Sequence, residues 1–325
     1  MAWFAVRRIA SMLLVMFAIS VLVFLIFFAT PGVDPAARLA GRSASPVVLE
    51  QVRHSFGLDQ PLPIRYVLMM KHLFWSRDLT SYVNIGAKVI PQIEAAAPIT
   101  LSLVIGAAVI WVAMGVFAGV VSAGSRGSFI DPTIILLGIG AISIPAYWLG
   151  EMVNLITQSR LHSGIFSWVP PLGYVSLTQN PGQWALHLLL PWLTLAVLYA
   201  GIYARILRAE LITALNDDYV RTARAKGLSE RRVMWRHALR CSLIPVVSLF
   251  GLDFGSLVGG AALLVEVVFG LQGIGYLTYV SLQNLDLPVI MGCVMYAAFF
   301  VVLTNAIVDL VYAWLDPRVR RTRHV

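Results

Sequence analysis

Six long runs of apolar residues, separated by shorter polar segments, dominate the pattern of the chain. Each run holds about 20 residues or more, and at a rise of about 1.5 Å per residue a helix of that length crosses a hydrocarbon layer of ~30 Å. The apolar core of a cleaved signal peptide would be shorter than the first run. The pattern therefore predicts six transmembrane helices, at about 9–29, 96–123, 130–156, 184–207, 243–269 and 288–314.

A mostly polar region separates the first run from the second. Proline and glycine punctuate it in PGVDP (31–35) and FGLDQPLP (56–63), and Ser45-Pro46 is typical of a capped helix start. The stretch YVLMMKHLFW (66–75) is apolar on one face but too short to span, so we expect it at the membrane surface or packed on the helices. The chain thus divides into a first helix (1–30), an external region (31–95), a core (96–315) and a basic tail (316–325).

One polar stretch, residues 216–245, combines charge, a helical pattern and a glycine between the fourth and fifth runs. The sequence Asn-Asp-Asp at 216–218 provides cap and acidic first-turn residues, which predict a helix over 219–226. Gly227 follows where that helix would need a residue with positive φ to end. The pattern indicates a short helix that stops at a glycine.

A second helix is expected directly after the first. Ser229 is a suitable cap for a helix over 230–240, and Pro245 then falls in the first turn of the next span, where its missing N–H costs little. Two interpretations of these coupling helices at 216–240 stay open. They form a solvated basic loop that sets topology, or a docking element that transmits the movement of a cytosolic partner. Only the second accounts for Gly227 between two cappable helices.

Composition and charge settle the class and suggest an orientation. A mean hydropathy of +0.81 with 12% charged residues indicates an integral membrane protein. The net charge of +8 does not indicate nucleic-acid binding, because the basic residues lie in short loops between apolar runs. Most of the 24 Lys and Arg lie at the N-terminus, in the polar stretch or in the tail. We therefore expect these parts, and both termini, in the cytosol.

Three acidic residues lie in or near apolar runs, namely Asp253, Glu266 and Asp309. Carboxylates are costly in a membrane and usually face the bundle interior or a cavity, so each is a candidate functional residue. Asp253 is the best candidate for a translocation pathway, with a structural hydrogen bond as the alternative. Glu266 is a second pathway candidate, which we expect close to the external surface. Asp309 is expected to pair with a basic loop residue.

Small residues and prolines modify the runs. The fifth run has a small-xxx-small series that allows close approach of helices, and we expect its members to pack: Gly251, Gly255, Gly259 and Gly260. Pro145 and Pro191 are expected to kink the third and fourth spans. Cys241 and Cys293 have no spaced Cys/His cluster around them, so neither a disulfide framework nor a metal site is expected. An external turn, or a re-entrant gate, is expected at Gly270, Gly273 and Gly275.

The polar stretch resembles a known motif. DYVRTARAKGLSERRV (218–233) and RHALRCSLIP (236–245) are similar to the cytosolic coupling motif of ABC-importer permeases, in the dipeptide/oligopeptide/nickel branch. Gly227 takes the position of the motif's glycine, and Ala223 and Leu239 also match the general pattern. In WSRDLTSY (75–82), Arg77 and Thr80 replace glycines usual in that branch. Other segments similar to its B-type permease are PGVDPA (31–36), FGLDQPLPIRY (56–66), PITLSL (98–103), SIPAYWLG (143–150), LPWLTLA (190–196) and VDLVYAWLDPRVR (308–320).

The resemblance implies an all-α membrane protein with six transmembrane helices and cytosolic coupling helices, the type I ABC importer permease fold. It implies a permease of the bacterial inner membrane that imports peptides and does no ATP chemistry. Two ATPase subunits would bind ATP and Mg, while a C-type permease and an external solute-binding protein complete the complex. The residues it assigns to contact with the ATPases are Asp218, Tyr219, Arg221, Thr222, Ala223, Arg224, Ala225, Lys226, Gly227, Leu228 and Ser229.

Other classes fit the sequence less well. No G-x-x-x-x-G-K-[ST] phosphate loop occurs, in agreement with a subunit that lacks an ATPase site and a cofactor of its own. A secondary transporter would use Asp253, Glu266 or Asp309 as an ion relay, but no inverted repeat or pair of broken helices supports that. A membrane enzyme would need a motif such as G-x-S-x-G or H-E-x-x-H, and neither occurs in the sequence. The resemblance leaves open whether the solute is a dipeptide, an oligopeptide, glutathione or a nickel chelate.

Overall fold

The computed structural model describes residues 2–28, 36, 45–55, 58–84, 86–158 and 164–315. Within these residues, five helices are long and apolar enough to cross a membrane, and a bent pair would make a sixth. The predicted all-α class is confirmed. The five are α1 (Ala2–Phe28), α5 (Val89–Gly124), α8 (Pro181–Leu215), the continuous stretch Glu230–Ala261, and α14 (Leu287–Leu315).

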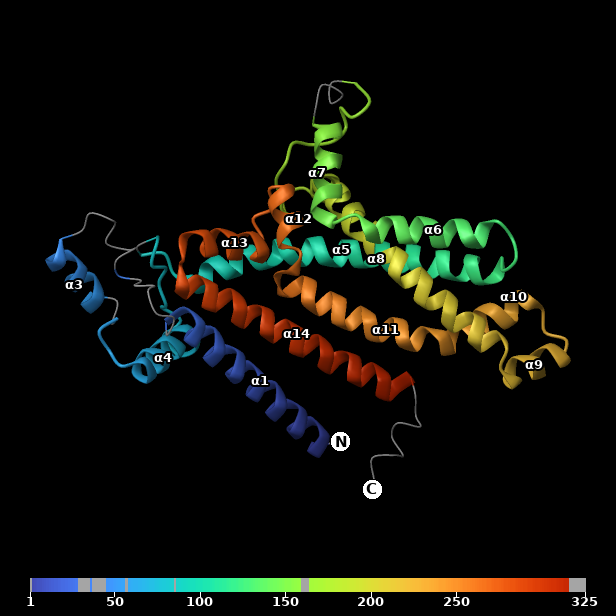
Figure 1. The fold of residues 1–325 in the computed structure, drawn as a ribbon, viewed down its shortest axis with the longest axis horizontal. Helices are drawn as coiled ribbons and strands as arrows, with labels where there is room; N and C mark the ends of the chain where they lie inside the picture. The colour runs from blue at the N-terminus through green and yellow to red at the C-terminus, as the bar shows by residue number, and fades with distance from the viewer. Residues whose placement is uncertain are drawn as a thin grey trace.

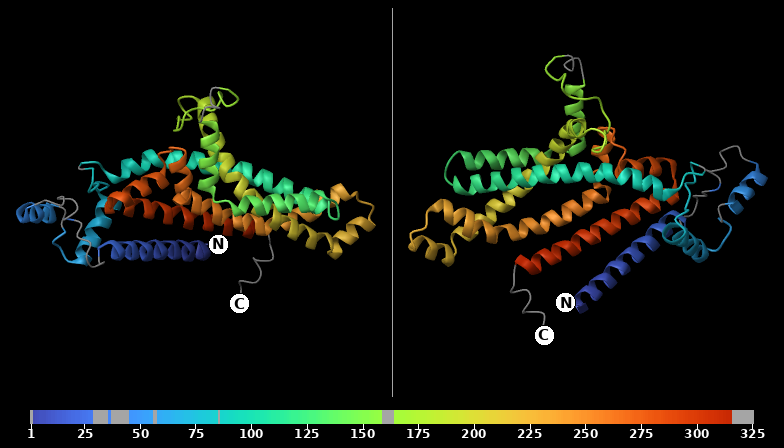
Figure 2. Two further views of the ribbon diagram at one scale, coloured as in Figure 1. Left: turned by 45° about the horizontal axis from the view of Figure 1, so that its top comes forward. Right: turned by 180° about the vertical axis from the view of Figure 1, so that it is seen from behind.

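The long helices form an elongated bundle (Figure 1). Helices α5 and α8 pack against each other along their length, with Trp111 and Tyr203 fully buried between them. A Cβ on Gly106 would lie 2.0 Å from the Trp192 indole, so only glycine lets that ring lie against α5. The Trp192 indole N–H donates to the Ser102 carbonyl oxygen at 3.0 Å. On the other side of the bundle, α1 lies beside α14 in every view (Figure 2).

The third apolar run is not one straight span. Helices α6 (Ile130–Ser143) and α7 (Ala146–Thr157) meet at a bend of 92°. Pro145 between them has no N–H, and Ile144 before it is extended (ψ 123°), as a following proline favours. Figure 1 shows α7 running across the long axis of the bundle. The predicted continuous helix at 130–156 is therefore wrong, and the expected kink is a full break.

The fifth run begins earlier than predicted. One continuous helix comprises α10 (Glu230–Arg232), the π-helical η3 (Val233–Ala238), α11 (Leu239–Ser256) and the π-helical η4 (Leu257–Ala261). Only Cys241 and Ser242 stand between Arg240 and Leu243, and the Ser242 hydroxyl donates to the Ala238 carbonyl of the same continuous helix. The separate second helix at 230–240 is therefore a wrong prediction, and Pro245 lies inside α11 and not in a first turn.

The fifth run also ends earlier than the predicted 269. Gly260 adopts a φ of +103°, which breaks the helix before Ala262. Two further helices, α12 (Leu263–Val268) and α13 (Ile274–Asn284), fold back and pack against each other. A helical hairpin therefore lies where the sequence predicted either an external turn or a re-entrant gate.

The region before α5 lies at the opposite end of the bundle from α9 and α10 (Figure 1). It contains α3 (Pro46–Ser55), α4 (Leu62–Met70) and the π-helical η1 (Lys71–Trp75). The Ser45 hydroxyl accepts a hydrogen bond from the Val48 N–H at 3.4 Å, as predicted for a capped start. Leu73 is buried with Phe24 and Met291, so η1 packs on the bundle. The PGVDP segment (31–35) and the basic tail lie outside the described residues.

Arg77 keeps the backbone of the glycine that it replaces. Its φ is 54°, in the left-handed region that glycine adopts readily and that costs other residues roughly 1–2 kcal/mol. Its guanidinium lies 3.6 Å from the carboxylate of Glu94, and both side chains are exposed. The departure from the resembled pattern therefore changes the side chain at this turn and leaves a glycine-like backbone.

Candidate functional site

The polar stretch forms α9 (Asp218–Ala225), a short helix beyond the end of α8 (Figure 1). Asp217 precedes its first turn with an extended backbone (ψ 154°). The Asp217 carbonyl oxygen accepts hydrogen bonds from the N–H groups of Val220 (3.0 Å) and Arg221 (3.2 Å). Its side chain makes no capping hydrogen bond, and neither does that of Ser229. The first helix thus lies where predicted, held by its backbone and not by the side chains expected to cap it.

Gly227 ends this helix as the sequence predicts. Its φ is +76°, and its N–H donates to the Arg224 carbonyl at 2.9 Å. The Leu228 N–H then reaches back to the Ala223 carbonyl at 3.3 Å, which satisfies a carbonyl at the helix end. A Cβ at Gly227 would meet nothing within 4 Å, so the position needs glycine for its backbone angle and not for space.

A small apolar cluster fixes α9 to the two helices that flank it. Val220, Ala223 and Val233 are buried in it, and Leu215 and Leu228 pack around them. Arg224 bridges the same elements, with Nε 2.8 Å and Nη2 3.1 Å from the two Glu230 carboxylate oxygens, and this bond raises the pKa of Arg224. An exposed ion pair contributes at most about 1 kcal/mol, whereas one buried valine contributes roughly 1.5–3 kcal/mol. The cluster is therefore the main attachment.

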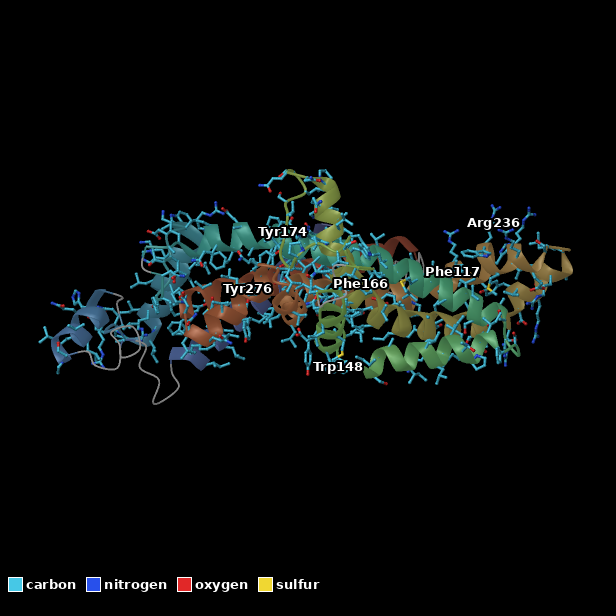
Figure 3. All side chains as sticks on the ribbon, turned by 90° about the horizontal axis from the view of Figure 1, so that it is seen from above. Phe117, Trp148, Phe166, Tyr174, Arg236 and Tyr276 are labelled. Atoms are coloured by element: carbon cyan, nitrogen blue, oxygen red, sulfur yellow. The ribbon has the colours of Figure 1, made fainter. Side chains whose placement is uncertain are left out.

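The outer face of α9 is polar and exposed. Among the residues expected to contact the ATPases, Ala223 points inward and Leu228 is half-buried, while the others are exposed on or beside α9. Partial burial raises the pKa of Tyr219 to about 12. Figure 3 shows nitrogen-bearing side chains gathered at this end of the molecule, around Arg236. The structure thus presents a short, cationic helix beyond one end of the bundle.

Asp253 lies on α11 and faces α8. The Tyr203 hydroxyl donates a hydrogen bond to its Oδ2 at 2.9 Å, and Tyr203 itself is fully buried. Aromatic rings surround the pair, since the ring of Trp111 lies 6.1 Å from that of Tyr203 and 5.9 Å from that of Phe250. The Asp253 carboxylate is half-buried. The structural hydrogen bond exists, and the other carboxylate oxygen accepts no hydrogen bond from the residues that the structure describes.

Glu266 is fully buried within the protein, and its expected position close to the external surface of the membrane stays a prediction. Its carboxylate accepts hydrogen bonds from the Thr100 hydroxyl (2.6 Å) and the Tyr276 N–H (2.8 Å), and Thr100 accepts from the Ile274 N–H (2.8 Å). A Cβ on Gly273 would lie 2.5 Å from the carboxylate. Glu266 therefore ties α12 to the first turn of α13 and to α5.

The glycine series of the fifth run faces α14. A Cβ on Gly251 would lie 1.9 Å from Val308 Cγ2, one on Gly255 would lie 3.1 Å from Thr304 Cβ, and one on Gly259 would lie 3.3 Å from Ala297 Cα. Gly260 serves a different purpose, because its positive φ forms the break before α12. The side chain of Asp309, further along α14, lies outside the part of the chain that the structure describes.

Sequence reasoning missed an ion pair between α6 and α8. Arg208 Nε and Nη2 each lie 2.6 Å from an oxygen of the Asp131 carboxylate, which also accepts from the Ser122 hydroxyl of α5. Asp131 is only 6% exposed. Both residues carry charge at the ends of apolar runs, and this is the sequence signal that predicts paired charges. The pair joins three helices near α9.

A bundle of membrane-length helices with a short charged helix fixed beyond one end is the architecture of a transport permease that a partner outside the bilayer operates. The chain belongs to the family of binding-protein-dependent transport system inner membrane components. The family's sequence model matches residues 112–321, and the model of its N-terminal part matches residues 1–104.

Curated relatives match over almost their whole length. A peptide transport system permease protein of Brucella abortus is 35% identical over 97% of this chain and 98% of its own. The glutathione transport system permease protein of an Escherichia coli strain is 36% identical over 98% of both chains. A dipeptide transport system permease protein of Alkalihalophilus pseudofirmus is 32% identical over 98% of this chain and 99% of its own. The chain is a multi-pass permease subunit of an ABC importer, with the type I permease fold.

Proposed function

We propose that this permease imports peptides. The support is that relatives which align with nearly the whole chain are named for peptide, dipeptide or glutathione transport, the last being itself a peptide. Asp253, half-buried beside Tyr203 with one oxygen free of a described partner, is a suitable pathway group for a cationic peptide amine.

Two ATPase subunits dock at α9 in this proposal and bind ATP and Mg, and the sequence of this chain contains no G-x-x-x-x-G-K-[ST] phosphate loop. The observation that carries it is the attachment of α9. The cluster around Val220 and Val233 and the Arg224–Glu230 pair hold it to both flanking helices. A movement of the docked partner then reaches α8 and α11 together. Coupling follows only where the ATPases bind the inward- and outward-facing states differently.

A C-type permease and an external solute-binding protein complete the proposed assembly. In the bacterial inner membrane, α9 and both termini face the cytosol, because the Lys and Arg of the short loops lie on that side. The region at 31–95 then faces outward, where the binding protein delivers the solute. Figure 1 agrees in one respect, since α3 and α4 lie at the opposite end from α9.

Uptake by vesicles that contain the complete transporter tests the proposal. We expect uptake of a labelled dipeptide to require ATP and the binding protein, and to stop without ATP even when a proton gradient is kept. Unlabelled dipeptide should compete, whereas a nickel chelate should not. Uptake that persists without ATP would contradict the energy source, and competition by the chelate alone would contradict the peptide substrate.

A further inference from the structure

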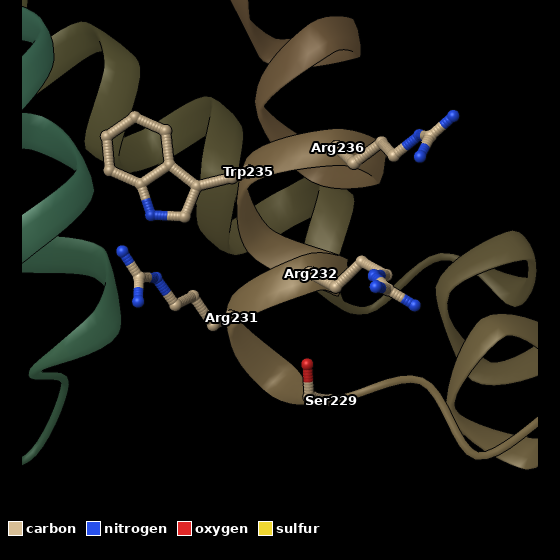
Figure 4. Close-up of a pocket in the computed structure, with 5 residues that line it drawn as sticks. All are labelled: Ser229, Arg231, Arg232, Trp235 and Arg236. Atoms are coloured by element: carbon tan, nitrogen blue, oxygen red, sulfur yellow. The ribbon is translucent and has the colours of Figure 1, made fainter.

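An open hollow of about 620 Å³ lies at the base of the fifth span. Figure 4 shows Arg231 and Trp235 projecting from one side of the helix and Arg232 and Arg236 from the other, with Ser229 below them. All five side chains are exposed. The hollow therefore combines three guanidinium groups, one hydroxyl and one indole N–H, which are all donors to an anion.

The three guanidinium groups have no carboxylate partner within the described residues. Glu230, their neighbour in sequence, already binds Arg224 through both of its oxygens. Arg232 and Arg236 lie four residues apart on one side of the helix, where like charges repel, while Arg231 projects from the other side (Figure 4). An anion seated among them would relieve this repulsion, and guanidinium forks bind phosphate oxygens in pairs.

The distance of the hollow from the apolar run indicates which source of phosphate would reach it. Arg236 lies seven residues before Leu243, where the apolar run starts, which is about 10 Å along a helix. The head-group layer extends roughly 5–8 Å beyond the hydrocarbon on each side, and long arginine side chains reach toward it. Trp235 is 49% exposed, and tryptophan concentrates at this boundary. The face of the helix that carries Val233 and Ala238 packs against the protein, since both side chains are buried.

We infer that this hollow binds the phosphate head group of an anionic phospholipid in the cytosolic leaflet. Clusters of basic residues next to a membrane span attract such lipids. The bound lipid fixes the start of the fifth span, and Val233 in the same turns packs on Val220 of α9. Lipid charge thereby acts on the element that receives the ATPases. The inference concerns the membrane and not the solute, so its test is independent of whether the permease transports peptides.

The test uses the complete transporter in nanodiscs that contain phosphatidylcholine with about one-fifth phosphatidylglycerol. Native mass spectrometry after mild delipidation counts the lipids that each complex retains. We expect the wild type to retain phosphatidylglycerol in preference to phosphatidylcholine. The variant with Arg231→Gln, Arg232→Gln and Arg236→Gln should lose most of that preference, by about threefold or more, and three Arg→Lys changes should preserve much of it because the charge remains.

Arg205→Gln is the matched control, because Arg205 is an exposed arginine of α8 outside the hollow and should leave the lipid preference unchanged. Equal retention by the wild type and the triple Gln variant would overturn the inference. So would release of the ATPases from the triple variant in pure phosphatidylcholine, since the arginines would then be a protein contact. Size-exclusion chromatography checks that each complex is intact.

Discussion

Gly227 illustrates how a single backbone angle can set the shape of the coupling element. The open space around its Cα admits any side chain, yet its φ of +76° is unfavourable for residues with a Cβ. Asparagine tolerates such angles better than a β-branched residue does. The two properties, space and angle, can therefore be separated by substitution.

We predict that Gly227→Val impairs coupling more than membrane insertion. Strain of about 1–2 kcal/mol would lower the population of the correct α9 conformation by roughly 5–30-fold. ATP-driven uptake in vesicles should fall accordingly, while the amount of protein in the membrane stays constant. Gly227→Asn should retain most of the uptake. Normal uptake by the valine variant would refute the role of the angle.

The Asp131–Arg208 pair makes a stability prediction at the same scale. Asp131→Ala would leave Arg208 unpaired next to Ser122 inside the helix contact, which costs about 3–5 kcal/mol for well-buried pairs and less here because Arg208 is 24% exposed. Thermal unfolding of the purified complex measures the loss. Removing both charges, in Asp131→Ala with Arg208→Met, should recover part of it.

An exposed ion pair provides the comparison for that experiment. Glu94→Ala removes the carboxylate 3.6 Å from Arg77, and both side chains are more than 60% exposed. Pairs of this kind contribute at most about 1 kcal/mol. Similar destabilisation by Glu94→Ala and Asp131→Ala would show that burial of the second pair has no special effect.

The apolar pattern predicted where the long helices lie, but it did not predict where they begin and end. Six prolines lie within the apolar runs. Pro132 and Pro288 lie in the first turns of α6 and α14, and three others stay inside continuous helices: Pro98 in α5, Pro191 in α8 and Pro245 in α11. Only Pro145 breaks its helix. Each proline beyond a first turn removes one hydrogen bond, and whether the helix continues depends on packing against its neighbours, as α5 and α8 do along their length. A single sequence does not reveal that packing. The sequence therefore predicted a kink at Pro145 but not the size of the bend.

The α12–α13 hairpin depends on the fully buried carboxylate of Glu266. We predict that Glu266→Ala frees the first turn of α13, because the Tyr276 N–H loses its acceptor and Thr100 loses its partner. Hydrogen exchange at the Ile274 and Tyr276 amides should accelerate about tenfold or more. Glu266→Gln keeps one carbonyl acceptor and should show a smaller increase.

Asn284→Ala, at the exposed far end of α13, is the control for that exchange experiment, since its amide donates to the Val280 carbonyl of the same helix. Equal acceleration in all three variants would mean that the hairpin loosens as a whole and that the carboxylate has no particular role.

At the scale of the molecule, the two ends of the bundle carry different elements. The cationic α9 lies at one end and α3 lies at the other (Figure 1). The number of Lys and Arg in the short loops predicts that the α9 end faces the cytosol, and this orientation stays a prediction. The sequence did not predict the Asp131–Arg208 pair or the burial of Glu266, because these contacts join residues far apart in the chain.

Topology can be read with a membrane-impermeant maleimide. In a Cys241→Ser background, Lys226→Cys on α9 should react in inside-out vesicles, and Glu50→Cys on α3 should react in right-side-out vesicles. Both positions are exposed, whereas Cys293 is 1% exposed and should stay unlabelled. Reaction of both new cysteines from the same side would refute the proposed orientation.

The attachment of α9 to two helices has a mechanical consequence. Helix α8 has 35 residues and is therefore about 52 Å long, so α9 stands at the tip of a long arm. A sideways displacement of about 5 Å at that tip tilts a straight arm of this length by only about 5–6°. Because α9 is also fixed to the start of the fifth span, that span swings with α8. A small stroke outside the membrane thus becomes a rotation of two spans about their far ends.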